Sequence, residues 1–385
     1  MKKNKAYITG ASLWCALGNT SHEITSALRA IHAQNYEAFL KKHFEQKPYY
    51  HLLESFESEE KKLYTCIDDV VRKAIKAAKL NEEEQAELAI FIGSTAMGIS
   101  LNEESYTRYQ LTHAGKAFEH IGYGYLGKYL EKVTHSKHKA LLFSTACTSS
   151  VNALAYASKM IEHGVISKAL VLGIELFNQT TYNGFSSLML LSKSTIYRPF
   201  DEKSDGIILG EGCSALILEN QPKHTDDFYY KSSKNICDIY SETTSDPSGE
   251  PIFETMDGAL KAAQLHLHDI NLIKAHATGS ENNNTSEANA LHLLFEKYQT
   301  HAPVTALKPF IGHTLGASGC NEIALMLLCA KEGFLPHTLG FETGTPKTSF
   351  TPMREPFTCK DNPLSILFNF VAFGGNTTSL ILARD

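Results

Sequence analysis

Short apolar runs alternate along this chain with longer segments in which apolar residues recur every three to four positions. The apolar runs lie at 88–93, 139–144, 169–173, 215–219, 272–276, 303–307, 364–370 and 379–383. The segments with helical periodicity include 23–31, 64–80, 254–266, 286–298 and 319–331. Continuous apolar runs predict strands covered on both faces, and their alternation with amphipathic helices predicts an α/β fold with largely buried sheets.

The order of predicted elements is similar in the two halves of the chain. A chain of 385 residues is long for one simple core. The loop at 220–227 therefore predicts a division into an N-terminal half, 1–225, and a C-terminal half, 226–385. The polar stretches 33–60 and 101–127 are predicted to be surface excursions, and the second is placed to cover a cleft.

Composition excludes several classes of protein. A formal net charge of -6 argues against a general nucleic-acid binder. No apolar run approaches the ~18 residues of a membrane span, and the N-terminal segment is predicted to be a first strand, with no signal peptide. Eight cysteines without zinc-type spacing or close pairing indicate a reduced, cytoplasmic location, and the paired histidines lack the further ligands of a metal site.

Cys147 is the first candidate catalytic residue. It follows a predicted strand, has small neighbours and precedes an Ala-rich helical segment, so it is expected at a sharp strand-to-helix turn. The N–H groups of a helix start favour a thiolate, which is a nucleophile for acyl transfer. The other cysteines have no comparable setting and are interpreted as small core residues: Cys15, Cys66, Cys213, Cys237, Cys320, Cys329 and Cys359.

Two histidines follow in polar, glycine-rich turns. His276 ends a predicted strand, and His313 lies among three glycines just before a helix. Lys308 and Glu322 flank His313, and a buried pair of this kind would orient a histidine and fix its charge. The alternatives are a His276 that caps the next helix, a solvated Lys308 and a Glu322 in the first turn of a helix.

The third candidate segment is Phe373-Gly374-Gly375, which follows an apolar strand. Paired glycines allow peptide N–H groups to converge as an oxyanion hole, although an ordinary tight turn is the alternative. A thiolate, two histidines and such N–H groups suit carbon–carbon bond formation between an acyl-enzyme and a decarboxylating thioester. A dinucleotide fingerprint at 122–127 follows no convincing strand and is interpreted as a loop.

These segments resemble, in order and over nearly the whole chain, a β-ketoacyl-acyl-carrier-protein synthase of the thiolase-like superfamily, in its Cys-His-His branch. The matching motifs are Ser-Thr-Ala-Cys147-Thr-Ser-Ser, Arg198-Pro-Phe-Asp201, Asp205 to Glu211, His276-Ala-Thr278, Lys308 to Gly319 and Phe373-Gly-Gly. The resemblance implies a five-layered αβαβα duplication that forms a dimer, with no cofactor.

The resemblance also implies roles for individual residues. Cys147 would take an acyl chain from acyl carrier protein, and His276 and His313 would bind and decarboxylate the malonyl thioester. Phe373 would be a gate whose N–H, with that of Cys147, forms the oxyanion hole. The remaining implied roles are support by Lys308 and Glu322, contact with the substrate by Thr278, Ser280, Gly374 and Gly375, and carrier-protein binding by Lys61 and Lys62.

The chain departs from the family pattern at Ala277, Asn284 and Ala372, and its first half is short. Its narrower similarity is to synthases of aryl-polyene-type pathways. The alternative function is a non-catalytic chain-length partner subunit of a heterodimeric ketosynthase, in which the nucleophile is typically replaced. A thiolase would need a second reactive cysteine where this chain has Phe373-Gly-Gly, and a starter-unit synthase would have Asn in place of His313.

Overall fold

The fold is built on one continuous mixed sheet of ten strands. The computed structural model describes residues 4–31, 35–43, 48–96, 98–118, 120, 122, 124–194, 196–345, 348–359 and 363–385. The strands of the sheet are β1 (Tyr7–Cys15), β3 (Ala89–Gly93), β4 (Leu141–Phe143), β5 (Lys168–Glu175), β7 (Gly212–Glu219), β8 (Phe228–Cys237), β9 (Leu272–Lys274), β10 (Val304–Thr305), β13 (Leu364–Val371) and β14 (Asn376–Arg384).

The sheet consists of two five-stranded halves with the same topology. From the central seam outwards, the strand order is β1-β7-β5-β3-β4 in one half and β8-β14-β13-β9-β10 in the other. In each half the two innermost pairings are antiparallel and the two outermost are parallel. A two-residue pairing of β1 with β8 joins the halves. This repeat of order and direction is a structural duplication, and we propose the loop at 220–227 as its division.

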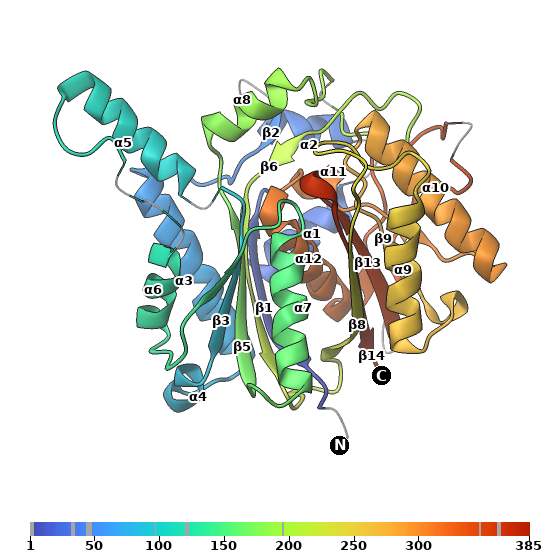
Figure 1. The fold of residues 1–385 in the computed structure, drawn as a ribbon, viewed down its shortest axis with the longest axis horizontal. Helices are drawn as coiled ribbons and strands as arrows, with labels where there is room; N and C mark the ends of the chain where they lie inside the picture. The colour runs from blue at the N-terminus through green and yellow to red at the C-terminus, as the bar shows by residue number, and fades with distance from the viewer. Residues whose placement is uncertain are drawn as a thin grey trace.

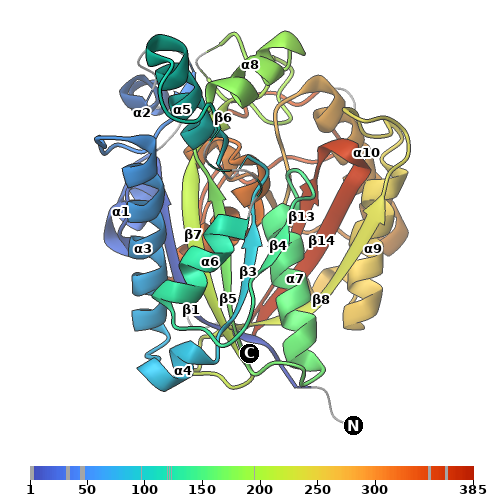
Figure 2. The same ribbon diagram turned by 60° about the vertical axis from the view of Figure 1, so that its left-hand side comes forward.

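Helices complete a five-layered αβαβα arrangement. The helices α7 (Ser149–Glu162) and α12 (Ser318–Lys331) lie between the two halves of the sheet. The outer faces are covered by α3 (Glu59–Ala77) and α6 (Gly124–Val133) on one side and by α9 (Glu250–Ala263) and α10 (Glu281–Tyr298) on the other (Figure 1; Figure 2). The predicted fold class is confirmed.

The strands bury both faces, as their continuous apolar runs predict. On β3, Phe91 contributes to the core around α7 and α12, whereas Ile90 and Ile92 contribute to the core beneath α3 and α6. On β13, Phe368 and Leu367 divide in the same way between the central core and the core beneath α9 and α10. Because successive side chains on a strand point to opposite faces of the sheet, each of these strands contributes apolar side chains to the helix layers on both sides of it.

Shorter elements connect these layers and surround the site. They are α1 (Ser21–Ala30), α2 (Tyr36–His43), β2 (Tyr49–Tyr50), α4 (Glu82–Ala86), α5 (Ile99–Thr112), α8 (Gln179–Ser187), β6 (Leu209–Gly210), η1 (Leu267–Asp269), α11 (Lys308–Ile311), η2 (Leu315–Ala317), β11 (Phe334–Leu335), β12 (Phe357–Thr358) and η3 (Phe373–Gly375). Among the described residues, none of the helices combines the length and apolar character needed to cross a membrane.

The stretch 33–60 is only partly the surface excursion that the sequence predicts. It contributes α2 and β2, and the hydroxyls of the buried Tyr36 and Tyr50 both donate to the carbonyl oxygen of Pro309, at 3.0 and 2.6 Å. Positions 33, 34 and 44–47 of that prediction lie outside the described residues. Of the stretch 101–127, residues 101–112 project from the body as part of the helix α5 (Figure 1), whereas 124–127 begin the helix α6 and pack on the sheet. The predicted loop at 122–127 is therefore wrong from Gly124 onwards, and positions 119, 121 and 123 lie outside the described residues.

Candidate active site

Cys147 lies at the sharp turn between β4 and α7. Ala146 has a left-handed backbone conformation, with φ of 50°, and Thr148 is the N-cap residue of the helix. The turn packs tightly on β3, because a methyl group at Gly93 would overlap the backbone of Ser150. Cys147 is 6% exposed at this turn and lines the adjoining cavity.

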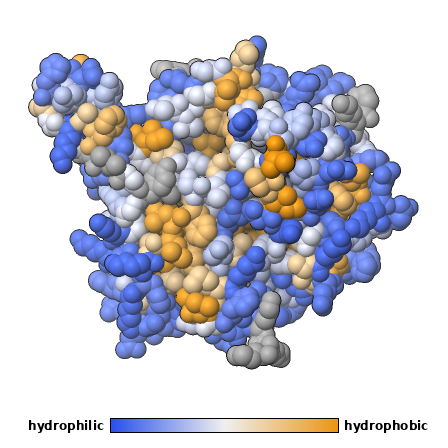
Figure 3. All heavy atoms as spheres, in the orientation of Figure 1, coloured by the Kyte–Doolittle hydropathy of each residue, from blue (hydrophilic) through white to orange (hydrophobic). Residues whose placement is uncertain are grey.

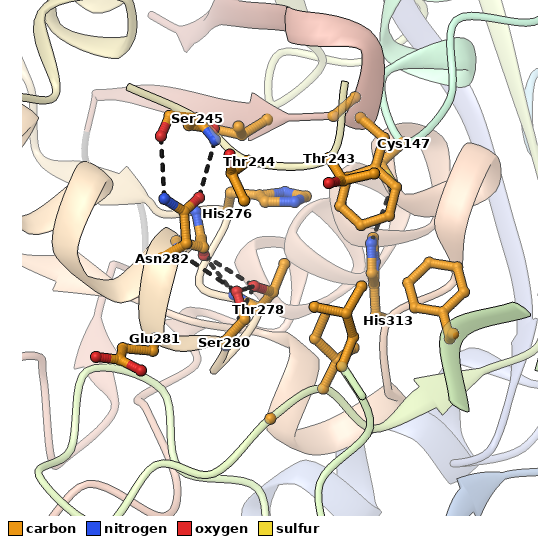
Figure 4. A pocket seen from close by; sticks show the side chains of 18 of the residues that line it. Cys147, Thr243, Thr244, Ser245, His276, Thr278, Ser280, Glu281, Asn282 and His313 are labelled. Atoms are coloured by element: carbon orange, nitrogen blue, oxygen red, sulfur yellow. Dashed lines mark hydrogen bonds between the residues drawn. The ribbon is translucent and has the colours of Figure 1, made fainter. Parts of the chain in front are cut away.

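His313 is held against Cys147 by its backbone and by its ring. Its N–H donates to the carbonyl of Ile208 at 2.8 Å, and its carbonyl accepts from the N–H of Gly210 at 3.1 Å. The ring Nε2 lies 3.1 Å from Sγ of Cys147 (Figure 4). On the other side of the ring, Nδ1 lies 3.1 Å from Oγ of Ser318. The backbone bridge and the Ser318 hydroxyl fix the ring so that Nε2 faces the sulfur.

His276 completes a cluster with these two side chains. It follows β9, and its ring lies 5.3 Å from that of His313, nearly perpendicular to it at 88°. Its backbone N–H donates to the buried carboxylate of Glu287 at 2.6 Å, whereas the N-cap of α10 is Ser280. The structure thus assigns helix capping to Ser280, so the ring of His276 stays available to the cavity.

Lys308 and Glu322 form a fully buried ion pair next to His276. The Lys308 ammonium lies 2.8 Å from Oε1 of Glu322, 2.5 Å from the carbonyl oxygen of His276 and 3.3 Å from its Nδ1. Both charged side chains are 0% exposed. The alternative of a solvated lysine is therefore wrong, because a buried charge requires partners of this kind. Glu322 lies near the start of α12, just beyond its first turn, and its carboxylate is buried in this pair.

The charge states of the three central side chains follow from burial. Burial and the neighbouring Lys308 ammonium hold the pKa values of His276 and His313 well below the usual range, so both imidazoles are neutral. Burial raises the pKa of the Cys147 thiol to about 12, although Lys308 and the N–H groups of Phe373 and Cys147 oppose the shift. The expectation of a resting thiolate is thus wrong, because desolvation outweighs the helix N-terminus.

The cluster opens into a cavity of about 310 Å³. Thr278 and Ser280 line it, and their hydroxyls lie 3.2 Å apart. On its apolar side, Phe185 stacks on Phe373 with ring centroids 5.6 Å apart. The two predicted hydroxyl residues and the predicted gate therefore border the same space as Cys147.

Gly374 and Gly375 shape the turn behind Phe373. Both have left-handed conformations, with φ of 73° and 76°. The N–H of Gly374 donates to the carbonyl of Glu242 at 2.7 Å, and the carbonyl of Gly375 accepts from the N–H of Asp238 at 2.8 Å. A methyl group at Gly375 would overlap the backbone of Asp238, so the turn and the end of β8 fit together only with glycine there.

Lys61 and Lys62 have different surroundings on α3. Lys61 is exposed, whereas the Lys62 ammonium lies 2.6 Å from the fully buried carboxylate of Glu211 and its side chain is only 12% exposed. The prediction that Lys62 binds a partner is corrected on this ground, because its charge is required inside the molecule. The prediction for Lys61 stays a prediction.

Three buried charged residues near the cluster escaped the sequence reasoning. Lys274 pairs with Glu322 at 2.7 Å, and Glu287 accepts the N–H groups of His276 and Ala277. Glu175 accepts the N–H groups of Thr95, Ala96 and Gly316, at 2.8 to 3.1 Å. For Lys274 the sequence does contain a signal, because a lysine within the apolar run 272–276 must have a charged partner if that run is a buried strand.

A loop also missed from the sequence faces His276 across the cavity. The backbone N–H and carbonyl of Ser245 bond to the side-chain amide of Asn282 at 2.8 and 3.0 Å, which holds 243–245 over the cavity (Figure 4).

Within the part of the chain that the structure describes, no group of three His, Cys, Asp or Glu side chains has the arrangement of a metal site.

Comparison with known proteins matches two family models. Residues 20–224 match the model described as the beta-ketoacyl synthase N-terminal domain, and residues 230–342 match that of its C-terminal domain. A putative mitochondrial 3-oxoacyl-[acyl-carrier-protein] synthase of Schizosaccharomyces pombe is 31% identical over 257 residues, which are 63% of this chain and 60% of that protein. This chain spans about 60% of the length of the first curated relatives that it matches.

Solved structures share the fold at lower sequence identity. The ishigamide ketosynthase/chain length factor structure superposes with a TM-score of 0.82 and 22% identity, over 100% of both chains. A ketosynthase in complex with its type II acyl carrier protein, AntDE:AntF, superposes with a TM-score of 0.85 and 18% identity, again over 100% of both chains. With both family models matched in order around the cluster of Cys147, His276 and His313, the chain belongs to the beta-ketoacyl synthase family.

Proposed function

We propose that this protein joins an acyl group held on Cys147 to malonyl-acyl carrier protein, with loss of carbon dioxide, to give a 3-oxoacyl-acyl carrier protein. The observation that carries the proposal is the geometry at the sulfur. Nε2 of His313 lies 3.1 Å from Sγ of Cys147, and the neutral ring of His276 stands beside it in the same cavity. The pathway served is fatty-acid or polyene/polyketide biosynthesis.

In the first half-reaction, Cys147 attacks the carbonyl of an acyl thioester. Because the resting sulfur is protonated, its proton passes to Nε2 of the neutral His313 as the carbon–sulfur bond forms. The tetrahedral intermediate places negative charge on oxygen, where the N–H groups of Cys147 and Phe373 are donors. The carrier thiolate then leaves with the proton from His313.

In the second half-reaction, the malonyl thioester loses carbon dioxide. The bond from the α-carbon to the carboxylate breaks, and its electron pair forms an enolate whose oxygen gains negative charge. Neutral His276 donates an N–H bond to that oxygen from Nε2, and burial together with Lys308 keeps both rings neutral. His313 donates from Nε2 as well once its ring has taken the other neutral tautomer, in which Nδ1 accepts from the hydroxyl of Ser318. The α-carbon then attacks the carbonyl carbon of the acyl-enzyme, and the bond from that carbonyl carbon to Sγ of Cys147 breaks as the new carbon–carbon bond forms. The sulfur leaves as a thiolate and takes up a proton from water, which restores the resting thiol.

The proposal also assigns the mouth of the cavity and the partner that uses it. The hydroxyls of Thr278 and Ser280 are suited to hold the amides of a pantetheine arm, and Gly374 and Gly375 support the turn that places Phe373. The partner is an acyl carrier protein, acyl-loaded and then malonyl-loaded. The complex of AntDE with its carrier AntF supports this by similarity of fold alone.

The open edge of the sheet is proposed as the contact with a second subunit, either another copy or a related chain. The edge strand β4 exposes Leu141 to 45%, and Tyr156 on the adjacent α7 is 59% exposed. Figure 3 shows apolar side chains gathered over the strip between α6 and α7. A cytoplasmic location is proposed as well, since all eight cysteines are free thiols.

The test is a two-step assay with identification of the product. Acyl carrier protein loaded with chains of different length and unsaturation is incubated with the protein, and the intact mass is measured. The expected result is one acyl group per chain, absent from Cys147→Ala, followed by a 3-oxoacyl product when malonyl carrier protein is added. Absence of any acyl transfer in the wild-type protein would contradict the proposal and favour the alternative of a non-catalytic chain-length subunit.

A further inference from the structure

A second buried lysine shares the carboxylate of Glu322 with Lys308. The ammonium of Lys274 lies 2.7 Å from Oε2, whereas that of Lys308 lies 2.8 Å from Oε1. All three side chains are 0% exposed. Each carboxylate oxygen therefore has its own cation, and the three groups together carry one net positive charge inside the protein when both lysines are protonated.

The surroundings of Lys274 fix the position of its ammonium. It donates to the backbone carbonyl of Asn369 at 2.9 Å and lies 3.5 Å from the ring centroid of Phe370, both on β13. Lys274 itself lies on β9, only two residues before His276. These contacts hold it on the far side of Glu322 from Lys308, in an almost water-free environment.

We propose that Lys274 is a positioning residue for the condensation step, because it anchors Glu322 and thereby holds the Lys308 ammonium against His276. Without Lys274, one oxygen of Glu322 would lose its cation and the carboxylate would turn towards Lys308, which would draw that ammonium away from its contacts at 2.5 and 3.3 Å with His276. The inference deepens the proposed function and rests on it.

The state of Lys274 depends on pH. Burial lowers the pKa of Lys274 to about 8, although Glu322 favours its charged form. The charged groups that face it are Glu322 from α12, Lys308 from α11 and Glu287 from α10. The titratable rings of His276 and His313 also interact with its charge, and both are neutral. As the pH rises through about 8, Lys274 becomes neutral and the support of Glu322 is lost, so condensation is expected to fall while acyl transfer to Cys147 continues.

The experiment compares acyl transfer and condensation in three proteins from about pH 6.5 to about pH 9.5. Lys274→Met keeps the unbranched shape and most of the length of the side chain and removes its charge. Lys168→Met is the matched control, because Lys168 also pairs with a buried carboxylate, that of Glu219, in a distant strand. Acyl transfer is read from intact mass, and condensation from the 3-oxoacyl product.

The wild-type protein is expected to lose condensation as the pH passes about 8, and Lys168→Met is expected to behave like it. Lys274→Met should condense up to about 100-fold more slowly at neutral pH, with a flat profile through that range, while its acyl transfer changes less than about threefold. Lys274→Gln, which restores an N–H donor without a titrating charge, should recover part of the rate and remain flat.

Three results would overturn the inference. They are unchanged condensation in Lys274→Met, a loss that falls equally on both half-reactions, and an alkaline decline that persists in Lys274→Met. If Lys274→Met does not fold, the profile of Lys274→Gln decides in the same way. A wild-type protein that accepts no acyl group would instead contradict the proposed function, so the two failures are distinguishable.

Discussion

Two adjacent glycines behind Phe373 allow a sharp test of how the turn positions its N–H group. Gly374 and Gly375 have nearly equal backbone conformations, with φ of 73° and 76°. An alanine at either position would bear the same left-handed strain, about 1 kcal/mol of unfolding free energy. They differ in their surroundings, so the pair separates backbone strain from displacement of the turn.

The expected magnitudes follow from what each added methyl group would meet. At Gly374 the nearest atom is Nδ2 of Asn376 at 3.9 Å, an ordinary contact. At Gly375 the methyl group would overlap the backbone of Asp238, which cannot rotate away as a flexible side chain does. The turn must therefore move, and with it the Phe373 N–H. Loss of one oxyanion donor typically costs about 10²–10³ in kcat.

The assay measures a single turnover of acyl transfer to Cys147. The mass of the intact protein is recorded over time, and the rate is that at which the acylated form appears. Gly375→Ala is expected to slow it by about 100-fold, whereas Gly374→Ala should slow it by less than about threefold. Thermal unfolding and circular dichroism are the controls that check whether both variants fold. Equal rates in the two variants, or a larger loss in Gly374→Ala, would refute the argument that the Asp238 contact positions the donor.

Three further predictions concern stability, pH and assembly. Burial opposes ionisation of Glu211, but Lys62 and other donors lower the pKa of its carboxyl to about 2. The charge of Glu211 therefore stabilises the fold above pH ~4.5, and this contribution is lost as the pH falls towards 2. Lys62→Met should therefore cost about 3 kcal/mol in urea unfolding at pH 7, and the exposed Lys61→Met almost nothing; equal effects would contradict the internal role. Burial raises the pKa of Cys147 to about 12, so the rate of its alkylation by iodoacetamide in the free protein should keep rising from about pH 7 to about pH 10. Peptide mapping measures this rate, and a plateau near pH 8 would show a resting thiolate instead. Leu141→Asp should convert a dimer to monomers in light scattering, and an unchanged mass would move the interface away from β4.

The sequence predicted those parts of the site that depend on local pattern. Cys147 was identifiable because an apolar run, small residues and an Ala-rich helix follow one another directly. The histidines and the glycine pair were identifiable as polar turns at strand ends, and the repeated order of elements indicated the duplication. Local sequence determines the turn and the helix start, so these features needed no knowledge of tertiary contacts.

The parts that failed depend on tertiary surroundings. Lys61 and Lys62 are neighbours in sequence, yet the 100° turn between them on α3 directs one to solvent and the other to Glu211. Lys274 meets Glu322 from 48 positions away, which no spacing rule anticipates. The charge of Cys147 was misjudged because the helix N-terminus is visible in sequence, whereas the depth of burial is a property of the folded protein.

The central claim is that one sulfur and two neutral imidazoles divide the chemistry between an acyl-transfer step and a condensation step. The most direct test follows the mass of the peptide that contains Cys147 in the wild-type protein and in His276→Ala, first with acyl carrier protein and then with malonyl carrier protein. We predict that both proteins load the acyl group on Cys147 and that only the wild type discharges it on addition of the malonyl thioester. Discharge by His276→Ala at the wild-type rate, or loading at another residue, would contradict the account.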